Sequence, residues 1–412
     1  MNYLFVCICF LFSGHNYYLS SSGDDNGDGT KDHPWTTIGR LKAVRLMAGD
    51  TVFFRGGEIF EGSLEWKEGP SGTKTHPLVI TSYEQGKAVI KAGDGLAIGL
   101  YQAKYVEIRN LQLVGSGRKN GNTQNGLVLN ACQHIDVDSV EVKGFIKAGV
   151  YVYRSDQVTI NRVDARENGY AGISVEGAYG KRDCHAVRIT DCRAANNPGD
   201  PSDLSNHSGN GIVAGYCRKV VIDHCTATNN GWDMPRIGNG PVGIWAYESD
   251  SVLIQHCISY RNKTSKGGDD GGGYDLDGGM THSTIRYCLS YENEGSGFGL
   301  FQYAGASPWF DNSIHDCVSQ NDGLVSAARA GVFIWNSSRD TGQLRNCRFY
   351  NNIIYNTKGA AIHYAVEGEH SGFRFYNNAF IATDSLIKGH RAVTDVFENN
   401  HWTGILPDSS FH

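Results

Sequence analysis

The chain has 412 residues, and its 43 acidic and 37 basic side chains leave a formal charge of −6 at neutral pH. Charged residues make up 19% of the chain, aromatic residues 11%, and glycine occurs 52 times. This turn-rich composition with many aromatic residues excludes an intrinsically disordered chain. The mild acidity excludes a typical nucleic-acid-binding protein, in which Lys and Arg would cluster on one surface.

Residues 1–14 contain a short apolar run, Leu4–Phe12. The run is too short to span a bilayer, and no later segment approaches the roughly 18 apolar residues of a membrane helix. Its length fits the apolar part of a secretory signal, although no Lys or Arg precedes it. We therefore expect a signal segment, a secreted or periplasmic protein, and no membrane partner.

Residues 15–107 are expected to form an N-terminal cap with the first coils of a solenoid. The sequence predicts a strand at Tyr17–Ser20, a short helix at Thr37–Met47, and a tight turn into a strand at Ala48–Val52. A cap is needed because the first coil of a stacked structure has an unpaired edge.

From residue 108 to residue 412 one phrase recurs, consisting of Ile or Leu, two variable residues, and Cys. Its cysteines lie 33, 32, 31, 29 and 30 residues apart. A fixed period of this length is typical of repeat architectures, which predicts one continuous domain of about 10–12 coils. The six copies end at Cys192, Cys225, Cys257, Cys288, Cys317 and Cys347. Related copies begin at Ile108, Val137, Ile160, Phe375 and Val396.

Each repeat predicts three short strands. The residues before the phrase alternate as a strand does, and the two variable residues before Cys interrupt the alternation and predict a bend. An Asn follows four or five residues after Cys and is expected at a second corner, where Asn side chains bond along the stack. A Gly then opens the third strand. The Asn residues are Asn197, Asn230, Asn262, Asn293, Asn321 and Asn352. Together these features predict an all-β parallel β-helix.

The repeated cysteines are predicted to be buried free thiols. In a stack of parallel strands they would lie about 4.8 Å apart, whereas a disulfide needs Cβ atoms at roughly 3.8 Å with a specific twist. Cys132, Cys184 and Cys217 lie outside this phase, and their state is left open.

The N-terminal segment resembles a known group of proteins. "YYLSSSGDDNGDGTKDHPWTTI" followed by "MAGDTVFFRGGEIF" is similar to the opening of many bacterial right-handed β-helix proteins of polysaccharide breakdown. Those families include glycoside hydrolases and polysaccharide lyases. The resemblance implies a right-handed β-helix and a carbohydrate substrate.

The third strand of each coil is expected to form the floor of a groove, because the loops that feed it vary most in length. Alternation turns Asp275 and Asp277 outward on one coil and aromatic rings outward on its neighbours. Paired acids beside exposed rings indicate a sugar-binding surface, although outward rings could also fill space under long loops. The predicted substrate-binding residues are Trp245, Tyr247, Phe301, Gln302, Trp335 and His363.

The stretch "GGDDGGGYDLDGG" places Asp269, Asp270, Asp275 and Asp277 within nine residues. Such acids repel one another unless a raised pKa or a cation relieves them, so the stretch predicts catalysis, a Ca²⁺ site or a solvated acidic turn. Asp275 and Asp277 are the predicted acid and base, in either order, with Glu248 as the substitute. Their spacing of about 6.5–7 Å along a strand favours an inverting mechanism. Glu176, His207 and His282 are further candidates.

"DDGGGYDLD" also resembles the calcium motif of polysaccharide lyase family 9. That resemblance implies Ca²⁺ at Asp269, Asp270 and Asp275. Two extra glycines interrupt the motif, and Gly299 stands where the family has its Lys base. Arg236, Lys266 or Arg329 could supply a base from the loops instead.

The residues therefore favour a glycoside hydrolase that acts on a polysaccharide or its oligosaccharides. Two alternatives stay open, a calcium-dependent lyase of a uronate polymer and a non-catalytic carbohydrate-binding solenoid. The hydrolase prediction requires no cofactor, and Ca²⁺ is the one candidate ion. The oligomeric state is not determined by the sequence.

Overall fold

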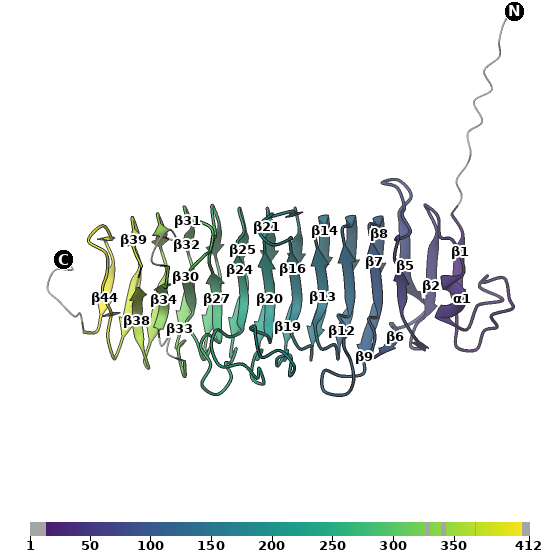
Figure 1. Cartoon of the computed structure of the whole chain (residues 1–412), viewed down its shortest axis with the longest axis horizontal. Coiled ribbons are helices and arrows are strands. Elements are labelled where there is room, and N and C mark those ends of the chain that lie inside the picture. The colour runs from purple at the N-terminus through teal and green to yellow at the C-terminus, as the bar shows by residue number, and fades with distance from the viewer. Residues whose placement is uncertain (1–13, 327–329, 339–342, 367, 406–412) are drawn as a thin grey trace, which may run out of the picture.

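The computed structural model describes residues 14–326, 330–338, 343–366 and 368–405. The chain winds into a solenoid in which each coil contributes one short strand to each of three long parallel sheets, here called A, B and C (Figure 1). The predicted all-β parallel β-helix is confirmed. Of the predicted signal segment 1–14, all but Gly14 lies outside the described residues. Within the described part of the chain, no helix is long and apolar enough to cross a membrane.

Sheet A contains the strand that opens each coil. Its strands, in spatial order, are β1 (Asn16–Leu19), β2 (Thr51–Arg55), β5 (Leu78–Tyr83), β8 (Lys104–Arg109), β11 (Gln133–Asp138), β14 (Asp156–Asn161), β18 (Arg188–Thr190), β22 (Val221–Asp223), β25 (Leu253–Gln255), β28 (Thr284–Arg286), β32 (Ser313–His315), β36 (Arg348–Tyr350), β40 (Arg374–Tyr376) and β43 (Val396–Glu398). Two short strands join the same sheet, because β17 (Cys184–His185) pairs with β14 and β21 (Cys217–Arg218) pairs with β17.

Sheet B follows after a sharp corner. Its strands are β3 (Ile59–Glu61), β6 (Ala88–Gly93), β9 (Leu111–Gly115), β12 (Glu141–Lys143), β15 (Asp164–Arg166), β19 (Arg193–Ala195), β23 (Thr226–Thr228), β26 (Ile258–Tyr260), β29 (Leu289–Tyr291), β33 (Val318–Gln320), β37 (Ile353–Asn356), β41 (Ala379–Ala382) and β44 (His401–Thr403).

Sheet C closes each coil and follows the loops of most variable length. Its strands are β4 (Leu64–Trp66), β7 (Ile98–Tyr101), β10 (Leu127–Asn130), β13 (Ala148–Tyr153), β16 (Ala171–Glu176), β20 (Asn210–Gly215), β24 (Val242–Tyr247), β27 (Gly272–Leu276), β30 (Phe298–Gln302), β34 (Ala330–Asn336), β38 (Ala360–Val366) and β42 (Ile387–Lys388). A small separate sheet holds β31 (Trp309–Phe310), β35 (Leu344–Arg345) and β39 (His370–Ser371).

The N-terminal end carries the one described helix, α1 (Ile38–Lys42), which is shorter than the predicted Thr37–Met47. Thr37 caps it, because its side chain accepts a hydrogen bond from the backbone N–H of Arg40. Ile38 and Leu41 of the helix are buried and join the core that runs inside the coils.

The bend before each repeated Cys is confirmed. The residue just before the Cys position adopts a left-handed conformation on seven successive coils, with φ between 51° and 57°. A non-glycine residue is uncommon there, so the stacked backbone must hold it in place. These residues are Asp191, His224, His256, Tyr287, Asp316, Asn351 and Asn377.

The predicted thiol ladder is confirmed for the cysteines from Cys192 to Cys317. The Sγ of Cys257 accepts the backbone N–H of Cys225, and that of Cys317 accepts the backbone N–H of Cys288, each at 3.4 Å. All nine cysteines in the described residues are free and buried, including Cys132, Cys184 and Cys217.

The prediction that Cys347 continues this ladder is wrong. Asn352 takes the next ladder position, because its Oδ1 accepts the backbone N–H of Cys317 at 2.9 Å. Cys347 instead precedes β36, next to Asn312 of the preceding coil. The predicted copy that begins at Val396 is one residue too early. Asn400, not Asn399, accepts the hydrogen bond from Nδ2 of Asn378, at 2.9 Å.

A ladder of buried asparagines forms the corner between sheets B and C. The Nδ2 of each amide donates to the Oδ1 of the next, from Asn197 to Asn230, Asn262 and Asn293, at 2.9 Å per step. The prediction that Asn321 belongs to this ladder is wrong, because Asp322 accepts the hydrogen bond from Nδ2 of Asn293 at 2.7 Å. Asn321 is the left-handed residue beside it, with φ 53°.

Alternation along sheet C follows the prediction. The inward residues from Ile173 to Ile334 are fully buried in the core. The residues that alternate with them on each strand, including Asp275, lie on the outer face of the sheet. This face carries the candidate site.

Candidate active site

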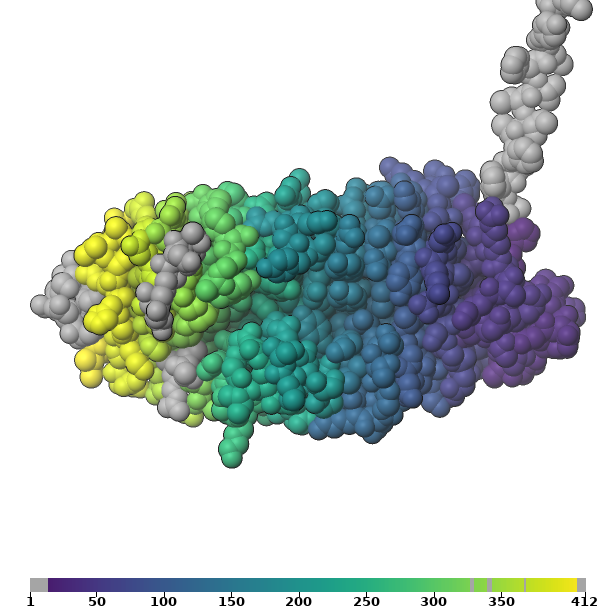
Figure 2. All heavy atoms as spheres, viewed as in Figure 1, coloured from purple at the N-terminus to yellow at the C-terminus, as the bar shows by residue number. Residues whose placement is uncertain are grey.

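Two rows of loops border the outer face of sheet C. The loops at 196–209, 229–241 and 261–271 lead from sheet B into sheet C, and those at 277–283 and 303–308 lead away from it. Figure 2 shows these rows on either side of a hollow along the middle of the molecule. Loops of variable length therefore border the regular strands of sheet C on both sides.

Asp275 lies on β27 of this face, in register with Trp245 on one side and Gly299 on the other. Its side chain is only 3% exposed, and its Oδ1 is buried without a hydrogen-bond partner. Burial, together with the negative charges of Asp277 and Asp270, raises the pKa of Asp275 well above its ordinary value. Burial therefore favours the protonated form of this carboxyl group.

Asp277 follows directly after β27 and is half-buried. The backbone N–H of Gly278 donates to its Oδ1 at 2.7 Å. Burial raises the pKa of Asp277 to about 6, and the neighbouring Glu248 adds to the rise against the effect of the Gly278 hydrogen bond. At neutral pH this carboxyl group is mostly ionised, whereas burial favours the protonated form of Asp275.

Glu248 follows β24 on the preceding coil and is nearly buried. Its Oε1 accepts the backbone N–H of Ser307 at 2.9 Å. Gly279 passes so close that a Cβ there would lie 2.5 Å from Oε2, and its φ is 71°, so glycine is required at this position. Arg182 fixes the same loop by donating to the carbonyls of Glu248 and Gly279 at 2.9 and 2.6 Å.

Asp270 approaches the pair from the opposite row of loops. It is half-buried, and its Oδ2 accepts the backbone N–H of Gly240 at 2.8 Å. Burial raises the pKa of Asp270 to about 7, and Asp277 and Asp269 raise it further against the pull of Arg236. Asp269 is exposed.

The acidic stretch does not fit a calcium site as it stands. Ca²⁺ takes six to eight oxygen ligands at roughly 2.3–2.6 Å. Among the described residues, only Asp223, His224 and His256 bring three acidic, His or Cys ligand atoms within 4.8 Å of one another. Asp269, Asp270 and Asp275 do not converge in this way, and one oxygen of Asp270 is already bonded to Gly240.

The predicted aromatic residues fall into two groups. Trp245 and Phe301 are buried at 4% and 7% exposure, and the indole N–H of Trp245 donates to Asn210 at 3.1 Å. Tyr247 and Trp335 are half-buried, so part of each residue is accessible. Tyr247 stacks on Trp245 with ring centroids 5.3 Å apart, so the buried ring supports the accessible one.

Gln302 and His363 are less suited to contact a ligand. Gln302 is fully buried, and its amide accepts from the Gly279 backbone N–H at 3.1 Å and donates to the Ser307 carbonyl at 3.0 Å. His363 is half-buried against Phe333 with centroids 5.0 Å apart, and burial lowers its pKa to about 4. Gln302 therefore ties two loops of the site together.

The other candidates lie elsewhere. Glu176 accepts bonds from Ser174 and Tyr170 at 2.8 and 3.1 Å, three coils from Asp277 or roughly 14 Å along the stack. His207 is buried against Trp245 with centroids 4.9 Å apart. His282 is on the sheet A side, bonded to Asp250 at 2.8 Å. None of the three reaches the acidic group.

Sequence reasoning missed Tyr303 and Arg182. Tyr303 is half-buried beside the acids, and burial together with the charges of Asp277 and Glu248 raises its pKa. Both residues lie in loops outside the repeat, so the period gave no signal for them. Asn210 was also missed, although it accepts the indole N–H of Trp245. It precedes Gly211, the glycine that marks the third strand of its coil, so the repeat could have pointed to it.

The Lys base of the lyase resemblance has no counterpart on the floor of the site. Gly299 pairs with Asp275, as predicted, and a Cβ at Gly299 would lie 2.7 Å from the Phe301 ring and 2.8 Å from Asp275 Oδ1. The space above Gly299 is thus filled by a ring and a carboxyl group.

This fold and its acidic groove define a right-handed β-helix of the kind found in carbohydrate-active enzymes. The chain belongs to the family described as Pel9A-like, right handed beta helix region, whose family model matches residues 17–322. The right-handed winding expected from the N-terminal resemblance is thereby confirmed.

Known structures share the fold at low sequence identity. The GH136 lacto-N-biosidase from Eubacterium ramulus is 16% identical with a TM-score of 0.63, covering 95% of this chain and 68% of its own. The Dettilon tailspike protein is 14% identical with a TM-score of 0.59, covering 93% of this chain and 68% of its own. XylC in complex with xylose is 10% identical with a TM-score of 0.55, covering 90% and 76%.

One sequence relative is the Bacillus subtilis (strain 168) protein YwoF, whose own function is not assigned. It is 28% identical over 168 residues, which is 41% of this chain and 31% of YwoF. The match spans about a third of that relative's length and shows nothing of its activity.

Proposed function

We propose that this chain is an exported glycoside hydrolase that acts on a polysaccharide or its oligosaccharides. The observation that carries the proposal is the chain of charge interactions among three neighbouring acids, in which Asp277 acts on Asp275 and Glu248 acts on Asp277. The half-buried rings of Tyr247 and Trp335 lie on strands of the same sheet. Glycoside hydrolysis needs one protonated and one ionised carboxyl group. The differing surroundings of Asp275 and Asp277 supply that difference.

In the proposed reaction Asp275 is the general acid. It donates its proton to the glycosidic oxygen as the bond from that oxygen to the anomeric carbon breaks. Asp277 is the general base, and it takes a proton from the water whose oxygen attacks the anomeric carbon. Glu248 raises the pKa of Asp277 and adds negative charge near the developing oxocarbenium ion. The backbone positions of residues two apart on an extended chain are about 6.5–7 Å apart, which favours an inverting enzyme, whose carboxyl groups are about 6.5–9.5 Å apart.

A calcium-dependent lyase is the second candidate, because the chain belongs to the Pel9A-like family. β-Elimination needs a base that takes the proton next to a uronate carboxylate. Gly299 offers no such group, and the acids nearby do not converge on one point for an ion. Both observations favour the hydrolase over the lyase.

Product analysis on a panel of polysaccharides separates the candidates. A new reducing end without ultraviolet absorbance supports hydrolysis, and an absorbing unsaturated uronate supports elimination. Affinity for a polysaccharide with neither product after long incubation supports the non-catalytic binder.

Substitutions then test the residues. Removing either catalytic carboxyl group is expected to lower turnover roughly 10²–10⁴-fold, the usual contribution of a general acid or base. The variants are Asp275→Asn and Asp277→Asn, and the matched control is Asp269→Asn, an exposed acid of the same stretch. Unchanged turnover in both site variants, with a native circular dichroism spectrum, would exclude the proposed pair.

A further inference from the structure

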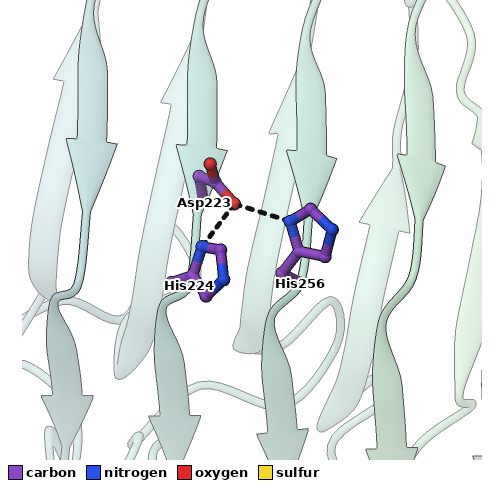
Figure 3. A group of neighbouring side chains, drawn as sticks. All are labelled: Asp223, His224 and His256. Carbon is purple, nitrogen blue, oxygen red and sulfur yellow. Dashed lines mark hydrogen bonds and ion pairs between the residues drawn. The ribbon is translucent and has the colours of Figure 1, made fainter.

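The outer face of sheet A carries a cluster that the proposed hydrolysis does not use. Asp223 ends β22, and His224 and His256 are the left-handed corner residues of two successive coils. The repeat itself therefore places the two imidazoles side by side, one coil apart. Figure 3 shows both rings directed at the Asp223 carboxylate.

The three side chains meet at one carboxylate oxygen. The Oδ1 of Asp223 lies 2.8 Å from Nδ1 of His224 and 2.9 Å from Nδ1 of His256. The rings are stacked, with centroids 4.7 Å apart and planes 27° apart. One ligand atom from each residue lies within 4.8 Å of the other two.

Surrounding residues hold this arrangement without blocking it. Gln255 donates to the other oxygen, Oδ2 of Asp223, at 3.0 Å, and itself accepts from Arg286 at 2.9 and 2.7 Å. These bonds leave Oδ1 to the two imidazoles. The side chains of His224 and His256 are 61% and 40% exposed, so an ion can reach the cluster from solvent.

We propose that Asp223, His224 and His256 bind a divalent transition-metal ion of the Zn²⁺ class. Two imidazole nitrogens and one carboxylate suit such an ion, with bonds of about 2.0–2.2 Å. In a tetrahedral site the ligand atoms are about 3.3 Å apart, so each Nδ1, at 2.8 or 2.9 Å from Oδ1 of Asp223, needs to move away from that oxygen by only a few tenths of an ångström. Water fills the remaining position.

Metal binding requires an unprotonated nitrogen on each imidazole. In the metal-free cluster Nδ1 of His256 carries the hydrogen that it donates to Asp223, so this ring becomes the Nε2–H tautomer when Nδ1 binds the ion. The ion then joins two coils through three coordinate bonds, in place of the contacts that Asp223 makes with the two imidazoles.

A neighbouring pair provides a matched control. His282 Nδ1 lies 2.8 Å from Asp250 Oδ1 on the same side of the molecule, and its side chain is 54% exposed. It has the same chemistry as His256 with Asp223, but it lacks a second imidazole. His256→Phe keeps a ring that can stack on Tyr287, now 5.3 Å away, and removes the nitrogen.

The experiment is calorimetric titration of the untagged chain with Zn²⁺ at pH 7.5. The wild type and His282→Phe are expected to bind one ion at pH 7.5 with equal affinity, and His256→Phe at least about tenfold more weakly. Co²⁺ should give a d–d spectrum without a thiolate charge-transfer band. No binding by the wild type, equal binding by His256→Phe, or a thiolate band from the cysteines would each overturn the proposal. Activity on polysaccharide is not the readout, so the outcome is independent of the proposed hydrolase.

Discussion

Asp322 offers a sharp test of how the asparagine ladder stabilises the fold, because it is a carboxyl group among amides. It is fully buried, and its Oδ1 accepts two hydrogen bonds from Asn293, at 3.0 and 2.7 Å. Its Oδ2 accepts the Ser319 hydroxyl at 2.7 Å. One coil earlier, Nδ2 of Asn293 makes the equivalent contact with the Ser290 hydroxyl at 3.0 Å. An amide at position 322 would therefore find the same partners.

The magnitude follows from the pKa. Burial raises the pKa of Asp322 to about 6, against about 3.9 for an ordinary Asp. The folded state therefore holds the proton more tightly than the unfolded state. The stability from this group is fully present below about pH 4 and is lost as the pH rises through about 6. Each unit of pKa difference between the folded and unfolded states corresponds to 1.36 kcal/mol, so the free energy of unfolding falls by about 3 kcal/mol by pH 8.

We expect Asp322→Asn to raise the free energy of unfolding by about 3 kcal/mol at pH 8 and by less than about 0.5 kcal/mol at pH 4. Chemical denaturation followed by tryptophan fluorescence at both pH values measures this, after refolding has been shown to be reversible. Asn293→Asp is the matched control, since it adds a buried carboxyl group to the preceding rung and should destabilise at pH 8. An equal change at both pH values, or a loss of stability at pH 8, would refute the reasoning.

Four further outcomes are expected. The acidic limb of kcat/KM against pH should lie near 6, where Asp277 loses its proton, and the limb should disappear from any residual activity of Asp277→Asn. Gly299→Ala should lower both activity and Tm, because its Cβ would lie 2.7 Å from the Phe301 ring and 2.8 Å from Asp275 Oδ1; a native Tm with full activity contradicts the described packing. Cys257→Ala should cost about 1–2 kcal/mol in chemical denaturation through the cavity it leaves, and a larger loss would mean that the thiol ladder does more than fill space. Dialysis against EGTA should leave hydrolysis unchanged, whereas loss of activity that Ca²⁺ restores would favour the lyase.

The repeat could be predicted because each coil requires small buried residues at fixed places. The bend before Cys225 and the amide bond from Asn197 to Asn230 both follow from the period alone. The predicted phase of the repeat is wrong where Asn takes the position that Cys occupies on other coils. Asn352 occupies a position that five coils fill with Cys, and both residue types fit a small buried corner. Residue type alone could not distinguish the two corners.

The site was predictable only as far as alternation reaches. The outward direction of Asp275 follows from a strand period of two, and its register with Gly299 follows from the repeat. The burial of Trp245 and Gln302 depends on the paths of the loops, which carry no period. Tyr303 was missed for the same reason.

Asp275 and Asp322 show why a raised pKa does not by itself mark an active site. Both carboxyl groups are buried, and burial is the first cause of the raised pKa in each. Asp322 has a bonded partner for both oxygens and fits a ladder that runs along the fold. Asp275 has a buried oxygen without a partner and faces two other acids. A fold gains nothing from such an arrangement, since an unpartnered buried polar group costs about 1–3 kcal/mol. The retained cost, beside accessible rings, is what a proton donor poised for a substrate oxygen would require.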